Sequence, residues 1–149
     1  MVDVSAKAVT VRDAVARGRV EVSAAAMRVA RAGNLPKGAV AEVARIAGVM
    51  AAKRTHEAIP LCHPLVLSHV DVDVTARGNG FDVEARVRTE AKTGAEMEAL
   101  HAVAVAALTV YDMLKAADEA ATITDIRLVA KTGGKSGRFS APVRRRRNG

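Results

Sequence analysis

Aromatic residues and cysteine are scarce in this chain of 149 residues, which holds no tryptophan, one tyrosine, two phenylalanines and one cysteine. Sheets that bind RNA or single-stranded DNA stack the bases on aromatic rings, so this scarcity argues against a nucleic-acid-binding function. A single cysteine excludes an internal disulfide and fits a reducing compartment. We therefore expect a cytoplasmic protein.

Long apolar runs are also missing from the sequence. The N-terminus carries Asp3 and lacks the apolar segment of a signal peptide. No run approaches the roughly 18 apolar residues of a membrane-spanning helix. The sequence thus predicts neither a signal peptide nor a membrane span.

The overall composition is that of a folded domain, with 50% apolar and 26% charged residues. Alanine and valine dominate, and a core of such small side chains buries little area per residue, which favours additional burial in a homo-oligomer. The net charge is +7, and the run Arg144–Arg147 supplies four of these charges. We predict one domain over residues 1–137 and a basic, disordered tail over 138–149.

The apolar pattern predicts an α+β fold. Ser23 is a good N-cap for the first helix, Gly33 ends it, and Thr93 with Glu96 forms a T-x-x-E capping box for the last helix. The order β-α-α-β-β-α-β indicates a ferredoxin-like (α/β plait) sandwich, in which helices cover one face of an antiparallel sheet. Strands are expected near residues 19–22, 66–75, 81–87 and 123–130, and helices near 24–31, 38–55 and 94–118.

Residues 53–65, K-R-T-H-E-A-I-P-L-C-H-P-L, are the most informative stretch of the chain. Its two prolines remove backbone donors and restrict the residues before them, so we expect the helix to stop here and the chain to be extended. Lys53, Arg54 and His63 are then presented by a rigid, irregular connection, where binding and catalytic residues tend to lie.

The long helix carries ionisable residues at both ends of an apolar stripe. Glu98, His101, Asp112 and Lys115 follow helical spacings of three and four, which predicts one shared face. Asp112 and Lys115 can form either a surface ion pair or an acid–base pair, and His101 is expected to be a satisfied core residue. Glu98 lies about 21 Å from Asp112 along the helix, so one small site can hardly use both from the same chain.

The segment K-T-G-G-K-S-G at 131–137 is similar to a P-loop but is not one. Val129 stands where the Walker pattern needs glycine, and no helix is expected after the segment. Its backbone N–H groups, Lys131 and Lys135 suit a phosphate, or the segment is a solvated linker. Cys62 and the nearby histidines lack a second ligand pair, so no metal site is predicted. The run Arg144–Arg147 is expected to be solvated.

Several motifs, taken in order, resemble the cyclic pyranopterin monophosphate synthase family, molybdenum cofactor biosynthesis protein C (MoaC). The resemblance covers nearly the whole chain except the arginine tail. It departs from the family pattern only at Ala95, where valine is usual, and at His56, a variable position. The matching segments are M-V-D-V-S at 1–5, T-V-R-D-A-V-A-R-G at 10–18, K-G-A-V at 37–40, A-R-I-A-G-V-M-A-A-K-R-T at 44–55, I-P-L-C-H-P-L at 59–65, K-T-G-A-E-M-E-A-L at 92–100, L-T-V-Y-D-M-L-K at 108–115 and K-T-G-G-K-S-G at 131–137.

This resemblance implies a lyase that converts (8S)-3′,8-cyclo-7,8-dihydroguanosine 5′-triphosphate, a cyclised dihydro-GTP, to cyclic pyranopterin phosphate and releases pyrophosphate. It implies acid–base roles for Asp112, Lys115 and Lys131. It implies substrate binding by Leu61, Cys62, His63, Met97, Glu98, Arg12, Lys37, Lys53 and Lys135. No cofactor is expected, and the sequence leaves open whether Mg²⁺ accompanies the triphosphate.

The resemblance also implies a homohexamer, a trimer of dimers with sites shared between subunits, and no nucleic acid or membrane as partner. Two other classes stay open on the residues alone. A small basic α+β domain could bind RNA, or the chain could be a structural homo-oligomer with solvated basic groups. Purified protein supplied with the cyclised dihydro-GTP separates the three, because only the enzyme yields pterin product and pyrophosphate.

Overall fold

The computed structural model describes residues 1–33, 35–135 and 137–142, and its elements follow the predicted order with two short additions, α3 and β5. The elements are β1 (Thr10–Glu21), α1 (Ala24–Ala32), α2 (Val40–Lys53), α3 (Thr55–Ala58), β2 (Leu67–Ala76), β3 (Gly80–Ala91), α4 (Glu96–Leu114), β4 (Thr122–Thr132) and β5 (Phe139–Ser140).

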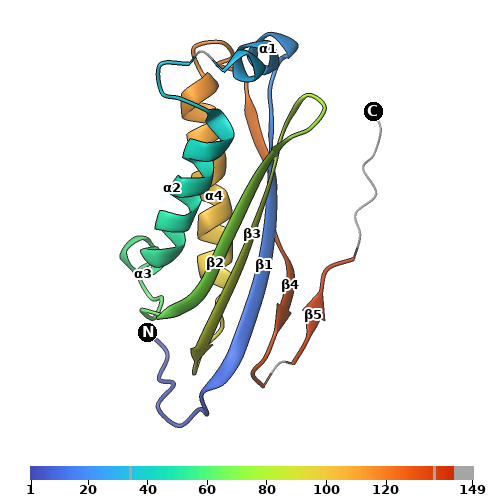
Figure 1. Cartoon of the computed structure of the whole chain (residues 1–149). Coiled ribbons are helices and arrows are strands. Elements are labelled where there is room, and N and C mark those ends of the chain that lie inside the picture. The colour runs from blue at the N-terminus through green and yellow to red at the C-terminus, as the bar shows by residue number, and fades with distance from the viewer. Residues whose placement is uncertain (34, 136, 143–149) are drawn as a thin grey trace.

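The strands form one antiparallel sheet in the order β2-β3-β1-β4-β5. Figure 1 shows α2 and α4 side by side along one face of this sheet, with α1 at one end of the helix pair and α3 at the other. Each face of the sheet alternates along the strands, so apolar residues of β1, β2 and β3 meet the helices. The predicted ferredoxin-like α+β sandwich is confirmed.

The first strand is far longer than predicted. Only residues 19–22 were expected to be extended, whereas β1 spans Thr10–Glu21. Its buried face carries the small residues Ala14, Ala16 and Gly18, and its other face carries charged side chains. Small and charged residues do not give the strong apolar alternation by which a strand is found in a sequence.

Small residues also bring α2 and α4 close together. A side chain at Gly48 would meet the Ala102 carbonyl and the Val72 side chain at 3.0 Å and the Ala106 Cβ at 3.3 Å. Contacts this close leave no room for a larger residue. The alanine-rich composition therefore produces a tightly packed helix pair, and at Gly48 the α2 backbone lies directly against both α4 and β2.

The segment after α2 is only partly extended. Thr55–Ala58 forms a short helix, α3, contrary to the expectation that the chain becomes extended at residue 55. The helical run stops before Ile59, which precedes Pro60 and has the extended backbone that a following proline requires. The prolines thus end the helix a few residues later than predicted, and the irregular connection is residues 59–66.

By length and composition alone, α4 could cross a membrane, since it has 19 residues and a mean hydropathy of 1.4. Half of its apolar window is buried inside the fold, however, against the sheet and α2. Ala102, Val103, Ala106 and Val110 are completely buried. We conclude that α4 is the core helix of the domain.

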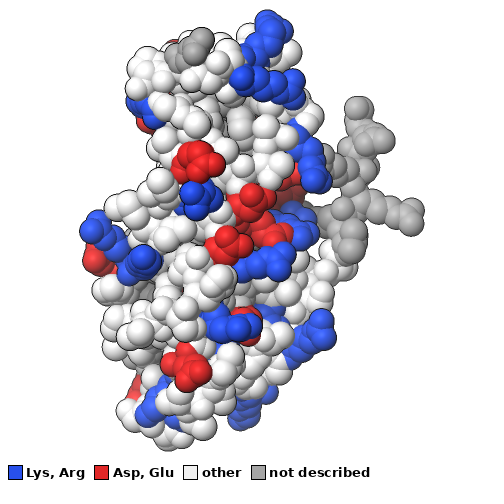
Figure 2. All heavy atoms as spheres, viewed as in Figure 1, with Lys and Arg blue, Asp and Glu red and all other residues white. Residues whose placement is uncertain are grey.

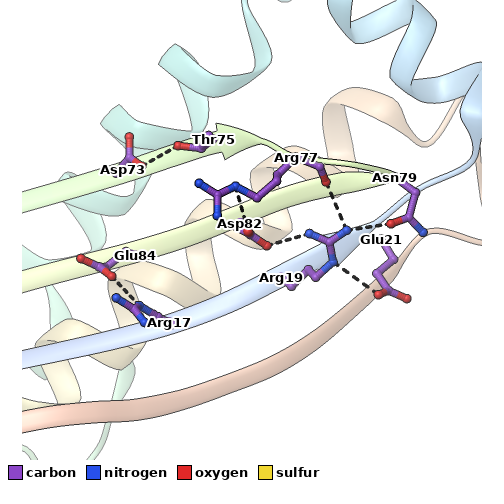
Figure 3. Close-up of polar contacts among 9 residues, drawn as sticks. All are labelled: Arg17, Arg19, Glu21, Asp73, Thr75, Arg77, Asn79, Asp82 and Glu84. Atoms are coloured by element: carbon purple, nitrogen blue, oxygen red, sulfur yellow. Dashed lines mark hydrogen bonds and ion pairs between the residues drawn. The ribbon is translucent and has the colours of Figure 1, made fainter. Parts of the chain in front are cut away.

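The face of the sheet that the helices leave open is covered by alternating charges, which Figure 2 shows as interleaved blue and red groups over the strands. Arg88 pairs with Asp13 at 2.7 Å between β3 and β1. In the close-up of Figure 3, the nearly buried Arg19 donates to Asp82 at 2.6 Å and to Asn79 at 2.7 Å in the β2–β3 hairpin. These contacts fix the hairpin to β1.

The expected disorder of residues 138–149 is wrong for the part nearest the sheet. Phe139–Ser140 pair with Ala130 and Lys131 as β5, at the edge of the sheet. The backbone of the edge strand β4 offers unpaired donors and acceptors, which a following segment of chain can satisfy. The predicted arginine run at 144–147 lies outside the described residues.

Candidate active site

The predicted functional residues gather at the two ends of α4. At its C-terminal end, Lys37 and Lys115 meet Asp112, and we call these three the Asp112 cluster. At its N-terminal end lie five side chains that we call the Glu98 cluster: Arg12, Cys62, Glu96, Glu98 and Lys131. Because α4 is one continuous helix, Glu98 and Asp112 are about 21 Å apart along its axis.

In the Asp112 cluster one carboxylate accepts hydrogen bonds from two ammonium groups. Lys115 Nζ lies 2.8 Å from Asp112 Oδ1, and Lys37 Nζ contacts Oδ2 from the connection between α1 and α2. Lys115 first and then Lys37 lower the pKa of Asp112 to about 2. The same contact raises the pKa of Lys115.

All three side chains of this cluster are exposed, as the surface ion-pair interpretation predicted, and 49% of the Asp112 side chain is accessible. Two lysines from different parts of the chain nevertheless converge on one carboxylate. The Asp112 carboxylate is ionised at neutral pH and lies between two ammonium groups that can donate protons. This arrangement suits acid–base chemistry on an anionic ligand.

Glu98 has the opposite surroundings, because only 2% of the residue is exposed. Its Oε1 accepts a hydrogen bond from the Cys62 thiol at 3.7 Å, and its Oε2 is buried with no partner among the described residues. Burial raises the pKa of Glu98, and burial followed by the charge of Glu98 raises the pKa of Cys62. A carboxyl group of this kind holds its proton more readily than an ordinary glutamate and can donate it.

Glu96 does not form the predicted capping box. The N-cap of α4 is Ala95, and no side chain caps the helix. Glu96 Oε1 instead accepts a hydrogen bond from Lys131 Nζ at 2.7 Å. Burial opposes ionisation of Glu96, but the bond from Lys131 and the nearby charge of Arg12 hold its pKa below the usual value. The prediction from the T-x-x-E pattern was therefore wrong. The Glu96 carboxylate forms an ion pair with Lys131, from another part of the chain, instead of capping its own helix.

The glycine segment after β4 wraps around Arg12. A side chain at Gly134 would collide with the Arg12 guanidinium, and one at Gly133, whose φ is 93°, would collide with the Val11 carbonyl. The Nε of Arg12 is buried without a partner among the described residues. The segment thus brings main-chain N–H groups, a guanidinium and Lys131 together, a combination that binds phosphate oxygens.

The other predicted residues belong to neither cluster. Leu61 and His63 flank Cys62, and Met97 flanks Glu98, so all three adjoin the Glu98 cluster in sequence. Lys53, the last residue of α2, is exposed, as is Lys135 in the segment after β4. Ser136 lies outside the described residues. Lys37 is not brought to the Glu98 cluster, because it belongs to the opposite end of the helix pair.

The helical stripe predicted to run from Glu98 to Lys115 is not one face. Glu98 points inward, whereas Leu108 and Asp112 are exposed. An ideal helix turns about 20° per seven residues relative to a 3.5-residue repeat, so a stripe this long drifts around the helix. His101 is half-buried, and its ring has the hydrogen-bond partner expected of a core histidine, because Nδ1 lies 3.2 Å from the Thr55 hydroxyl.

Two residues that the resemblance does not assign to the site line a hollow on the outward side of the helices. His101 and Arg54 lie there among residues of α2, α3 and α4, and the full lining is Ala47, Met50, Ala51, Arg54, Glu57, Ala58, His101 and Val105. In the described part of the chain, no three His, Cys, Asp or Glu side chains converge as metal ligands would.

The sequence model of the MoaC family matches residues 1–134. The chain belongs to the MoaC family. Among its relatives is a protein of Chloroflexus aggregans named cyclic pyranopterin monophosphate synthase, which is 57% identical over 139 residues, covering 92% of this chain and 84% of that protein.

Two more relatives carry the same name and extend the range of organisms. The Nostoc sp. protein is 54% identical over 145 residues, or 96% of this chain and 86% of its own length. The Parvibaculum lavamentivorans protein is 53% identical over 143 residues, or 95% and 89% of the two chains. The MoaC match includes every residue of both clusters.

Proposed function

We propose that this protein is a cyclic pyranopterin monophosphate synthase, a lyase of molybdenum cofactor biosynthesis. The observation that carries the proposal is its identity of more than half to proteins of that name over more than nine tenths of the chain. The substrate is the cyclised dihydro-GTP, (8S)-3′,8-cyclo-7,8-dihydroguanosine 5′-triphosphate, and the products are cyclic pyranopterin phosphate and pyrophosphate.

The two clusters supply the groups that such a rearrangement needs. Opening the purine ring, rebuilding it as a pterin and closing a cyclic phosphate require several proton transfers and a clamp for a triphosphate. Asp112 is ionised between protonated Lys37 and Lys115, so it accepts protons while the lysines donate them. Lys131 and Arg12 beside the glycine segment bind phosphate oxygens.

Glu98 and Cys62 form the less solvated part of the proposed site. A mostly buried carboxyl with one unpartnered oxygen is suited to a hydrogen bond with the base of the substrate. Leu61 and Met97, both substantially exposed beside this pair, can pack on the flat ring. We propose that this end of α4 holds the base and the opposite cluster performs proton transfer.

We propose that sites are shared between subunits of a hexamer built as a trimer of dimers. The distance of about 21 Å between Glu98 and Asp112 supports sharing, because one substrate cannot place the same reacting atoms at both. A two-fold axis pairs one chain's Glu98 end with the other chain's Asp112 end.

The deciding experiment is turnover of the cyclised dihydro-GTP by purified protein, followed as pterin product and pyrophosphate. Release of both establishes the enzyme. An RNA-binding module or a purely structural oligomer would release neither. The same assay with and without EDTA tests our proposal that no cofactor is needed and decides whether Mg²⁺ accompanies the triphosphate. Cell fractionation tests the predicted cytoplasmic location.

Subunit mixing tests the shared site. Asp112→Asn and Glu98→Ala are each expected to be inactive. Exchanging their subunits should restore part of the activity, because some interfaces then combine the wild-type Glu98 of one subunit with the wild-type Asp112 of the other. Mass spectrometry of the mixture confirms that mixed oligomers form. If such oligomers form and remain inactive, each chain carries its own site.

A further inference from the structure

The Glu96 carboxylate lies where several groups that bind anions meet. Its Oε1 accepts a hydrogen bond from Lys131 Nζ at 2.7 Å, and the charge of Arg12 also acts on it. The carboxylate accepts a further hydrogen bond from its own main-chain N–H, at the first residue of α4. An ammonium, a guanidinium and the first N–H of a long helix are groups that also bind phosphate oxygens. Glu96 therefore places an anion of the protein itself among the proposed phosphate-binding groups.

This position of Glu96 depends on the small size of Gly94. A side chain at Gly94 would collide with the Glu96 carboxyl group, which is folded back over the glycine. Gly94 is not among the described glycines with positive φ, so its backbone conformation is open to other residues. What Gly94 contributes is therefore room for the carboxylate beside Lys131.

The carboxylate leaves part of the donor set without a partner. The Nε of Arg12 is buried and has no hydrogen-bond partner among the described residues. Gly134 packs directly against the guanidinium of the same arginine. A pyrophosphate group carries more oxygens and more negative charge than a carboxylate. It can therefore use donors that Glu96 does not satisfy.

The contact between Glu96 and Lys131 is accessible to an anion in solution. The two side chains are 28% and 26% exposed. A partly exposed ion pair is weak, because water screens it and competes for both groups. A multiply charged ligand that offers Lys131 stronger hydrogen bonds can therefore replace the carboxylate.

We propose that Glu96 is an internal competitor for phosphate, a carboxylate that holds Lys131 and is displaced from it when a polyphosphate binds. Gly94 belongs to the same device, because it gives the carboxylate room to fold back. Weakly bound anions are excluded from Lys131, since every ligand must first displace the carboxylate. The inference rests on the proposed function, because it assumes that this end of α4 binds the phosphates of the substrate.

Direct binding of pyrophosphate tests the displacement. Calorimetric titration of the purified full-length protein in EDTA gives the dissociation constant without requiring turnover. Glu96→Gln keeps the shape of the side chain but removes its charge, so pyrophosphate should bind about two- to fivefold more tightly, the range of a partly exposed ion pair. If Glu96 only positioned Lys131, the same variant would bind more weakly. Unchanged or weaker binding overturns the proposal.

Gly94→Ala separates the position of the carboxylate from its charge. The added methyl group forces the carboxyl of Glu96 away from its place beside Lys131 but leaves its charge, so pyrophosphate should again bind more tightly. Glu90→Gln removes an exposed carboxylate from β3 and is the control for net charge. Equal tightening in Glu90→Gln, or none in Gly94→Ala, would show that net charge rather than displacement sets the affinity.

The double variant Gly94→Ala/Glu96→Gln tests whether the two residues act as one device. It should bind pyrophosphate no more tightly than Glu96→Gln, because the competing carboxylate is already gone. Additive effects would mean that the two residues act independently and would contradict the proposal. Circular dichroism checks the fold of each variant. If Gly94→Ala fails to fold, the comparison of Glu96→Gln with Glu90→Gln decides.

The displacement and the proposed function have different readouts. Tighter pyrophosphate binding in Glu96→Gln, with no conversion of the cyclised dihydro-GTP by wild type, supports the displacement and refutes the proposed function. Conversion by wild type without a gain of affinity in Glu96→Gln keeps the function and refutes the displacement. Wild-type protein that does not bind pyrophosphate overturns the displacement whatever its activity.

Discussion

The two ends of α4 carry carboxylates with opposite surroundings. Asp112 is exposed and accepts hydrogen bonds from Lys115 and Lys37, which lower its pKa to about 2. Glu98 is almost completely buried and contacts a neutral thiol, and its burial raises its pKa. One helix therefore presents an acid that stays ionised and an acid that tends to keep its proton.

This difference also gives the two residues opposite effects on stability with pH. Asp112 favours the folded state above its ordinary pKa of 3.8, and that contribution disappears as the pH falls towards about 2. Glu98 acts in reverse. As the pH rises above the ordinary 4.5 of a glutamate, the unfolded chain releases this proton more readily than the folded chain, so stability falls. A site that moves protons can use two carboxyl groups whose surroundings push their pKa values apart in this way.

The largest expected effect comes from removing the charge at the exposed end. Asp112→Asn keeps the shape of the side chain but cannot accept a proton, so turnover of the cyclised dihydro-GTP should fall by about 10²–10⁴-fold. Circular dichroism and light scattering should show an unchanged fold and mass, since the residue is exposed. Near-normal turnover would mean that Asp112 is only a surface ion pair.

A second comparison separates two lysines by their surroundings. Lys131 is mostly shielded beside Glu96 and Arg12, whereas Lys53 is exposed at the end of α2. Lys131→Ala should weaken inhibition by pyrophosphate by about 1.5–3 kcal/mol, roughly 10- to 150-fold, as loss of a charge-assisted hydrogen bond does. Lys53→Ala should have a smaller effect in the same direction, because an exposed charge is screened.

Inhibition constants measured at two salt concentrations check this prediction. The effect of Lys53→Ala should shrink as salt is added, and that of Lys131→Ala should persist. Equal constants for wild type and both variants would remove the two lysines from the phosphate site.

The sequence predicted the fold well where local chemistry determines it. Ser23 caps α1 and Gly33 ends it with a φ of 70°, as expected. Most of β1 was not predicted because its inner face carries mainly alanines and a glycine, which give little of the apolar alternation that marks a strand. Strand formation there depends on pairing with β3 and β4, which no local pattern contains.

The site was predicted by resemblance more than by pattern. Spacing found Asp112 with Lys115, and the structure adds Lys37 from a distant segment. The capping-box pattern assigned Glu96 to the helix end, but the structure gives its carboxylate to Lys131. Helical spacing also could not show that Glu98 is turned inward, because small angular drifts along α4 decide which side chain is buried.

Glu98→Gln offers a stability test of the buried end. The amide has nearly the same shape but never ionises, so the variant should lack the loss of stability that wild type shows as pH rises from 5 to 8. The melting temperature should therefore fall with rising pH more in wild type than in the variant. Melting curves of both proteins at the two pH values measure it. Parallel shifts in the two proteins would show that another group causes the pH dependence.

The smallest expected effect is on the thiol that contacts this carboxyl. Burial and then the charge of Glu98 raise the pKa of Cys62, so little reactive thiolate is present near pH 8. Glu98→Gln removes the charge and should therefore speed alkylation of Cys62 by iodoacetamide severalfold, even though the thiol is no more exposed. Denatured protein gives the rate of the unprotected thiol, and Glu57→Gln, which removes an exposed carboxylate from α3, is the matched control. If Glu57→Gln speeds the reaction as much as Glu98→Gln, general charge rather than the Cys62–Glu98 contact sets the reactivity. An unchanged rate in Glu98→Gln would show that burial alone protects the thiol, and the two residues would then be neighbours without electrostatic coupling.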